Sequence, residues 1–171
     1  KVEESIEKPN EYFDNNVRKS SVLFDTCIKH KLNNIIFSST AAVYGNKSEF
    51  PIIEDTVLSP LNPYSHSKLL TEEYLEKLSR ENKANYIALR YFNVAGADPL
   101  LRSGLISNKS THLIKIASEA VVKKRDHVEI FGNDYPTSDG TAIRDYIHIS
   151  DLAEAHVLSL KYLLSKKKSL I

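Results

Sequence analysis

Two short apolar runs, each preceded by a stretch with helical spacing, constrain the fold of this chain most. Residues 34–39 (NIIFSS) follow residues 10–31, and residues 86–92 (YIALRYF) follow residues 64–82, in which apolar side chains recur as on an amphipathic helix. A helix, strand, helix, strand order with apolar strands is typical of an α/β protein with a parallel sheet. Ligands of such sheets bind beyond the carboxyl ends of the strands, where we expect the functional residues.

The second half of the chain predicts further helices and strands. Its expected elements are an amphipathic helix over residues 111–125, short strands over 128–132 (VEIFG) and 144–149 (RDYIHI), and a last helix that starts after Ser150 or Asp151.

Length and charge exclude several classes of protein. The 171 residues, 42% of them hydrophobic, suit one globular domain or most of one. With 23 basic and 22 acidic residues, the charge balance favours neither nucleic acid nor a membrane surface as partner. The six histidines show no spacing typical of metal ligands, and we assign no metal.

The single cysteine and the two ends of the chain suggest its context. Cys27 alone forms no internal disulfide, and neither a signal peptide nor a run of eighteen apolar residues is present. We therefore expect a cytoplasmic protein. Because the chain begins without methionine and stops directly after an expected helix, we also expect it to be a fragment of a longer one.

A tyrosine and a lysine share one face of the helix expected over residues 64–82. Tyr64 and Lys68 are four residues apart, so their side chains lie one above the other. A nearby cation favours the phenolate of a tyrosine, which would then exchange protons near neutral pH. The pair is also common on solvated helix faces and is weak evidence alone.

Polar and aromatic residues follow the two strands of the first half. Ser38, Ser39 and Thr40 place hydroxyls where a ligand is expected; they orient a substrate oxygen or simply cap the strand. Phe92 and Asn93 follow the second strand, either as a ring to stack on a ligand and an amide to bind it, or as a core aromatic and a turn residue.

One arginine is a candidate for binding phosphate. Arg144 either holds a diphosphate with its fork of donors or forms an ion pair with Asp145 or Asp151. No glycine-rich phosphate loop of either usual form is present in these 171 residues.

Five segments, taken in order, resemble the extended short-chain dehydrogenase/reductase family. They are ESIEKPNEYFDNNV, FSSTAAVYG, NPYSHSK, ALRYFNVAGA and IFGNDYPTSDGTAIRDYIHISDLAEAH, which together span most of the chain. The Tyr-x-x-x-Lys pair marks the whole superfamily, whereas the last segment is similar to the nucleotide-sugar epimerase branch.

The resemblance implies a fold and its division. The implied fold is part of a Rossmann-like, doubly wound parallel sheet plus the start of a smaller substrate-binding domain. Residues 1–95 would be the C-terminal part of the NAD-binding domain, and residues 96–171 a partial UDP-sugar-binding region with a returning strand and helix. The family's glycine-bearing first βαβ unit would precede Lys1, and the rest of the sugar domain would follow Ile171.

The resemblance also implies an activity, the interconversion of UDP-galactose and UDP-glucose through a 4-keto intermediate with NAD as cofactor. Tyr64 matches the catalytic base, and Lys68 matches the residue that holds the nicotinamide ribose and lowers the tyrosine pKa. Thr40 stands where these epimerases usually have serine, so the hydroxyl is kept.

Further residues match binding positions of the family. The cofactor set comprises Asn15, Ser39, Thr40, Tyr64, Lys68 and Phe92. The UDP-sugar set comprises Thr40, Tyr64, Asn93, His112, Leu113, Arg144 and the backbone around Glu129, Ile130 and Phe131; His112 stands where many relatives have asparagine.

Other functions stay open. A nucleotide-sugar 4,6-dehydratase or decarboxylase would need an acid pair after Thr40, where Ala41 and Ala42 stand. A non-catalytic dinucleotide-binding or interaction module would not need Thr40, Tyr64 and Lys68 together. The resemblance also implies a homodimer, formed through the helices around residues 11–31 and 64–82.

Overall fold

The computed structural model describes residues 2–47, 50–107, 110–166 and 168–171. By their contacts these residues form two units, one of Lys1–Tyr91 with Ala155–Ile171 and one of Phe92–Glu154. The last residues therefore pack with the first unit, although the sequence groups them with the second half. The predicted division into a cofactor region and a sugar region concerns function and stays a prediction.

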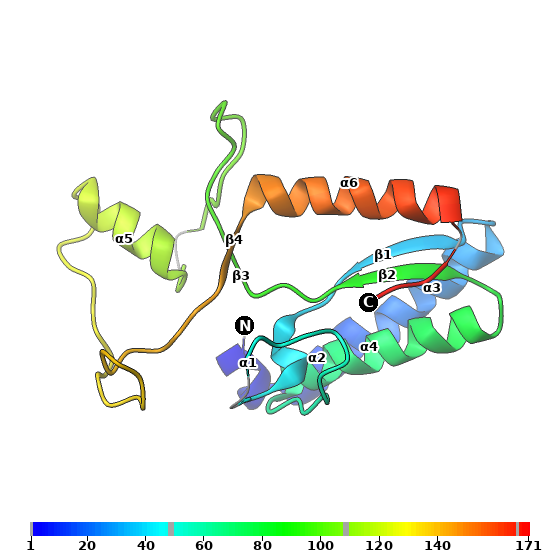
Figure 1. Cartoon of the computed structure of the whole chain (residues 1–171), viewed down its shortest axis with the longest axis horizontal. Coiled ribbons are helices and arrows are strands. Elements are labelled where there is room, and N and C mark those ends of the chain that lie inside the picture. The colour runs from blue at the N-terminus through cyan, green and yellow to red at the C-terminus, as the bar shows by residue number, and fades with distance from the viewer. Residues whose placement is uncertain (1, 48–49, 108–109, 167) are drawn as a thin grey trace. The chain divides into compact units, whose positions relative to one another are not determined.

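A parallel pair of strands forms the centre of the first unit (Figure 1). Strand β1 (Asn34–Ser38) pairs with β2 (Asn85–Leu89), in register from Asn34 opposite Asn85 to Ser38 opposite Leu89. Leu170 adds an isolated parallel bridge to Ile87. The two apolar runs are thus confirmed as neighbouring parallel strands, and their carboxyl ends meet at one edge.

The helices of the first unit follow the predicted order with one interruption. Before β2 its helices are α1 (Val2–Glu7), α2 (Pro9–Phe13), α3 (Lys19–Lys29) and α4 (Pro63–Arg80), and the 3₁₀ turn η2 (Ala41–Tyr44) lies between β1 and α4. A π-helical turn, η1 (Asp14–Arg18), separates α2 from α3 within the single helix that the sequence predicts.

None of the described helices is long and apolar enough to cross a lipid bilayer.

The start of α4 follows from local chemistry. The Asn62 side chain accepts a hydrogen bond from the Ser65 N–H at 2.9 Å, and the Ser65 hydroxyl accepts one from the Asn62 N–H at 3.3 Å. This reciprocal cap, with Pro63 in the first helical position, satisfies donors that a helix start leaves open. Tyr64 is therefore held in the first turn.

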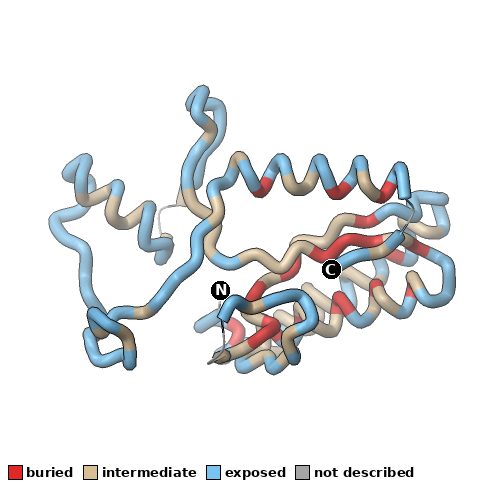
Figure 2. The backbone as a smooth tube through the Cα atoms, in the orientation of Figure 1, coloured by how far each residue is buried: buried red, intermediate tan, exposed pale blue. Residues whose placement is uncertain are grey.

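The core lies between the sheet and the helices α3 and α4. Ile35 and Phe37 of β1 point to the same face as their partners Tyr86 and Ala88 of β2, because side chains alternate along a strand. Phe24 of α3 and Leu75, Leu78 and Tyr74 of α4 pack against this face. Figure 2 shows the buried positions gathered along the two strands and α4.

A second helix layer covers the opposite face of the sheet. Ser38 points to this face, and its hydroxyl lies 3.0 Å from the Nε2 atom of His156 in α6 (Ile149–Lys166). Leu163 of the same helix is fully buried. The parallel sheet is thus enclosed on both faces, as the α/β pattern predicts.

The second unit has a smaller parallel pair. Strand β3 (Asn93–Ala95) pairs with β4 (Tyr146–His148), and α5 (Leu113–Val121) lies in the long connection between them. The strand expected over residues 144–149 and the helix expected over 111–125 are confirmed in shorter form. The last helix begins two to three residues earlier than expected, at Ile149.

The strand predicted over residues 128–132 is wrong. These residues adopt no strand, and no described segment pairs with them. Ile130 and Phe131 are 80% and 94% exposed. An apolar run becomes a strand only where a neighbour supplies a ladder of hydrogen bonds, and the described residues offer none here.

Candidate functional site

The candidate site lies where β1 ends. Thr40 is extended, with φ −154° and ψ 142°, and its hydroxyl oxygen accepts a hydrogen bond from the Ala42 N–H at 3.2 Å. Thr40 thus caps the 3₁₀ turn η2, as one of the two alternatives predicts. The same hydroxyl also lowers the pKa of Tyr64, so it lies within reach of the phenol and capping does not remove it from the site.

Tyr64 is partly buried beside this turn. Burial raises the pKa of Tyr64 above its usual value, the hydrogen bond from Thr40 lowers it, and the nearby Tyr91 raises it slightly. The net direction is upward, because burial disfavours the charged phenolate. The Tyr12 ring meets the Tyr64 ring edge-on at 6.4 Å between centroids. The lowering of the Tyr64 pKa by Lys68, expected from the sequence, is not among these effects.

Lys68 reaches from α4 to the end of β1. Its ammonium group donates a hydrogen bond to the Ser38 carbonyl oxygen at 2.8 Å and lies 4.7 Å from the centre of the Phe37 ring. Burial lowers the pKa of Lys68, and the negative charge of Glu72 acts in the opposite direction. The structure therefore brings Thr40, Tyr64 and Lys68 together at one strand end.

Ser39 is buried and makes a different contact from the one the resemblance implies. Its hydroxyl donates to the carboxylate of Glu72, one helical turn beyond Lys68. Arg90, directly after β2, donates two hydrogen bonds to the same carboxylate. Sequence reasoning missed Glu72 and Arg90, although the spacing Tyr64, Lys68, Glu72 continues one helical row and was a usable signal.

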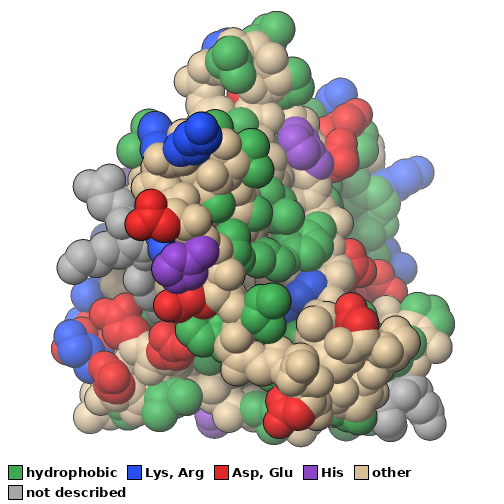
Figure 3. Space-filling view, turned by 90° about the vertical axis from the view of Figure 1, so that its left-hand side faces the viewer, with side chains coloured by type: hydrophobic (Ala, Val, Ile, Leu, Met, Phe, Trp, Pro, Cys, Tyr) green, Lys and Arg blue, Asp and Glu red, His purple; other side chains and the backbone are tan. Residues whose placement is uncertain are grey.

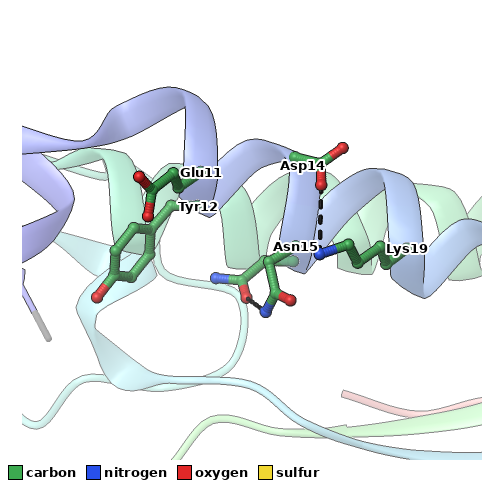
Figure 4. A pocket seen from close by; sticks show the side chains of 6 residues that line it. Glu11, Tyr12, Asp14, Asn15 and Lys19 are labelled. Atoms are coloured by element: carbon green, nitrogen blue, oxygen red, sulfur yellow. Dashed lines mark hydrogen bonds and ion pairs between the residues drawn. The ribbon is translucent and has the colours of Figure 1, made fainter.

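Asn15, an expected cofactor contact, lies in the π-helical turn η1. An open pocket of about 390 Å³ is lined there by Glu11, Tyr12, Asp14, Asn15, Asn16 and Lys19. In Figure 4 the side chains of Tyr12 and Asn15 project to the same side, whereas Asp14 points away and pairs with Lys19 at 3.4 Å. Single π turns occur often at functional sites because they redirect side chains.

Helix α4 holds this π turn in place. The amide of Asn16 donates to the Ser67 hydroxyl at 3.0 Å, and the Thr71 hydroxyl donates to the Asn16 carbonyl oxygen at 2.8 Å. Ser67 and Thr71 are both buried. The Lys19 N–H bonds five residues back to the Asp14 carbonyl oxygen, as in a π-helical turn. No pattern in the sequence predicted this support.

The expected sugar contacts other than Thr40 and Tyr64 lie in the second unit. The Asn93 amide donates to the Asp145 carbonyl oxygen at 2.9 Å and so ties β3 to the start of β4. His112 is the residue before α5, and Leu113, its first residue, is 52% exposed. Phe92 is 46% exposed and is not the core aromatic of the alternative prediction.

Arg144 and residues 129–131 are also exposed. In the described part of the chain, Arg144 forms no ion pair with Asp145 or Asp151, so that alternative is not observed. Large apolar side chains of this unit are also open to solvent, and Figure 3 shows hydrophobic side chains at the surface among charged ones. Within the described residues no three His, Cys, Asp or Glu side chains gather as a metal site.

The fold and the strand-end site define a class. Residues 1–169 match the model of the NAD dependent epimerase/dehydratase family, and the chain belongs to this family. The Rossmann-like fold and the family resemblance expected from the sequence are thereby confirmed.

Relatives of known structure and sequence are more specific. The chain is 49% identical over 162 residues to a UDP-glucose 4-epimerase of Azospirillum brasilense, covering 95% of this chain and 47% of that protein. It superposes on a UDP-glucose 4-epimerase of Brucella ovis in complex with NAD (TM-score 0.92, 43% identity, 99% of this chain, 52% of that one). It also superposes on a UDP-glucose 4-epimerase of Stenotrophomonas maltophila with bound NAD and formylated UDP-arabinopyranose, with a TM-score of 0.92 and 36% identity. This match covers 99% of this chain and 51% of that one. The chain thus spans about half the length of its relatives.

Proposed function

We propose that the full-length protein containing this chain interconverts UDP-galactose and UDP-glucose with bound NAD. The observation that supports this most is the group of Thr40, Tyr64 and Lys68 at the carboxyl end of β1, in a member of an NAD-dependent epimerase family. The relatives named UDP-glucose 4-epimerase point to the same substrates.

The described residues fit NAD. Asn15 lines an open pocket, and the partly buried ammonium group of Lys68 lies where parallel sheets bind ligands. Asn15, Ser39, Thr40, Tyr64, Lys68 and Phe92 would hold the cofactor, with Lys68 on the nicotinamide ribose. When bound, NAD supplies a hydride acceptor for C4 of the sugar and later returns the hydride.

Tyr64 would move the proton that accompanies this hydride. As phenolate it takes the proton from the sugar 4-hydroxyl, leaving a 4-keto sugar, and it gives the proton back when the hydride returns to the opposite face. No net oxidation results. The Thr40 hydroxyl would orient the sugar oxygen while Tyr64 acts as base.

The charge of Lys68 has a definite task in this scheme. Burial raises the pKa of Tyr64, so the phenolate needs a nearby positive charge. The ammonium group of Lys68, which bonds to the Ser38 carbonyl oxygen one helical turn beyond Tyr64, would provide this charge.

Residues of the second unit would bind the UDP-sugar. Arg144 is exposed and without an ion pair in the described part of the chain, which suits a diphosphate. Asn93, His112 and Leu113, with the backbone around Glu129, Ile130 and Phe131, would contact the sugar and uridine.

The assembly and its location are also proposals. A cytoplasmic homodimer through the helices around 11–31 and 64–82 is consistent with the exposure of Val22 and Leu23 on α3, 57% and 58%.

The test is turnover by the full-length protein. Purified protein should carry NAD and convert UDP-galactose to UDP-glucose, as followed by chromatography of the nucleotide sugars. A 4-keto-6-deoxy sugar as product would indicate a dehydratase instead. Bound NAD without any conversion would favour the non-catalytic module.

A further inference from the structure

A buried ion pair stands directly behind the candidate site. The side chains of Glu72 and Arg90 are 3% and 6% exposed, and two guanidinium nitrogens of Arg90 donate to the Oε2 atom of Glu72 at 2.6 and 3.0 Å. This forked geometry fixes both groups more firmly than a single contact would. The pair lies outside the set of residues that the resemblance implies.

The pair joins the ends of both strands to α4. The Glu72 carboxylate accepts the hydrogen bond of the Ser39 hydroxyl, at the end of β1. Arg90 follows β2 and also donates to the Tyr44 hydroxyl at 3.0 Å and the Glu54 carbonyl oxygen at 3.2 Å. The ends of β1 and β2, helix α4, the turn η2 and the main chain at Glu54 therefore meet at one ion pair.

Stability alone does not explain a buried ion pair. Removing two charges from water costs about as much as their attraction returns, and apolar replacements are often equally stable. Such a pair does impose one geometry, because each oxygen and nitrogen must keep its partner. The geometry fixed here is that of the turn from Ser39 to Tyr44, which carries Thr40.

We infer that Glu72 and Arg90 are positioning residues of the epimerase site: together they hold the Ser39–Thr40 turn against α4 and place a negative charge one helical turn from Lys68. The inference rests on the proposed function for its effect on turnover. Its effect on Lys68 is independent of turnover.

The surroundings of Lys68 make Glu72 the relevant charge. Helix α4 presents Tyr64 and Glu72, strand β1 presents the Ser38 carbonyl and the Phe37 ring, and Arg90 after β2 is paired with Glu72. His156 of α6 bonds to the Ser38 hydroxyl. Glu72 raises the pKa of Lys68 against the effect of burial, so its loss lets the lysine lose its proton at lower pH.

The experiment compares three variants of the full-length protein. Glu72→Gln keeps the shape and an oxygen for Ser39 but removes the charge. Ser39→Ala removes the hydroxyl and keeps the charge. Glu76→Gln is the matched control, since Glu76 lies one turn further along α4 in an exposed pair with Arg80. Measurements are kcat and KM as functions of pH, NAD content, and the titration of Lys68 by the ¹³Cε signal of labelled lysine, assigned with Lys68→Arg.

The expected results differ between the variants. Glu72→Gln lowers the Lys68 titration midpoint and moves the alkaline limb of kcat to lower pH. Ser39→Ala lowers kcat by up to about 10²-fold, the loss that a displacement of about 1 Å causes, with the Lys68 midpoint unchanged. Glu76→Gln changes none of these.

Two results would overturn the inference. One is a folded Glu72→Gln protein with unchanged kcat and Lys68 midpoint; the other is a Ser39→Ala protein with full kcat, which decides the matter if Glu72→Gln does not fold. If the parent protein shows no turnover, the proposed function fails. The Lys68 titration then tests the charge of Glu72 alone, and an unchanged midpoint in Glu72→Gln refutes the inference.

Discussion

The ammonium group of Lys68 donates a hydrogen bond to the main-chain carbonyl oxygen of Ser38 at 2.8 Å. This bond connects α4 to the last residue of β1 and fixes a positive charge at the edge where a parallel sheet binds its ligands. Tyr64, one helical turn earlier, and Thr40, two residues after Ser38, lie at the same edge. The four-residue spacing of Tyr64 and Lys68 is common in sequences, and this hydrogen bond fixes the position of Lys68 at the strand end.

Tyr64→Phe in the full-length protein should lower kcat by about 10²–10⁴-fold, because only the proton acceptor is lost. NAD should stay bound. The control is Tyr74→Phe on the same helix, whose hydroxyl bonds to Asp25 at 2.7 Å on the surface. Turnover of UDP-galactose is measured by chromatography, and a Tyr64→Phe enzyme within about twofold of the parent contradicts the role of base.

Lys68→Met should shift the acid limb of the rate profile to higher pH. The phenolate is the active form of Tyr64. Burial already raises the pKa of Tyr64, and loss of a nearby cation raises it further. A higher pH is then needed for the same phenolate fraction. The control is the exposed Lys77→Met. Profiles of kcat against pH that coincide for parent and Lys68→Met would count against the electrostatic role.

Thr71→Val should weaken NAD binding, whereas Thr71→Ser should not. The Thr71 hydroxyl supports the Asn16 carbonyl in the π turn that carries Asn15, and valine has the same shape without a donor. A lost hydrogen bond of this kind is worth about 1 kcal/mol, or about fivefold in Kd. Calorimetry on protein stripped of NAD measures this. Equal affinities of the two variants would show that the π turn needs no support from α4.

Glu72→Ala should lower the free energy of unfolding by about 3–5 kcal/mol, because it leaves Arg90 buried without its partner. Glu76→Ala, which breaks an exposed pair, should change it by less than about 1 kcal/mol. Urea unfolding followed by circular dichroism compares the two. Similar losses for both variants would indicate that the Glu72 environment is open to water in solution.

The 171-residue chain by itself should show no turnover and should bind NAD more weakly than the full-length protein. It spans about half the length of its relatives, and α6 leaves Val157, Leu158 and Leu164 more than half exposed. Exposed apolar faces of this kind favour self-association. Calorimetry with NAD and light scattering test this. Tight NAD binding by a monomeric, active chain is the contrary outcome.

The sequence by itself determined the elements whose signals are local. The two strands are short apolar runs, and α4 begins where Asn62, Pro63 and Ser65 supply a cap, so both were predictable. The spacing of Tyr64 and Lys68 placed them on one helix face, and the alternation of helix and strand predicted a site beyond the strand ends. These features depend on residues within a few positions of one another.

The tertiary structure alone decided which partners these residues meet. Glu72 binds Ser39, 33 residues away, and Ser38 meets His156, 118 residues away. The π turn at Asn15 depends on Thr71, and residues 128–132 lack a strand partner that their composition alone does not reveal. Such contacts arise only when the chain returns to the same place, because a hydrogen bond or a strand ladder needs both of its members. Local spacing therefore predicted the reactive pair, and long-range packing set its geometry.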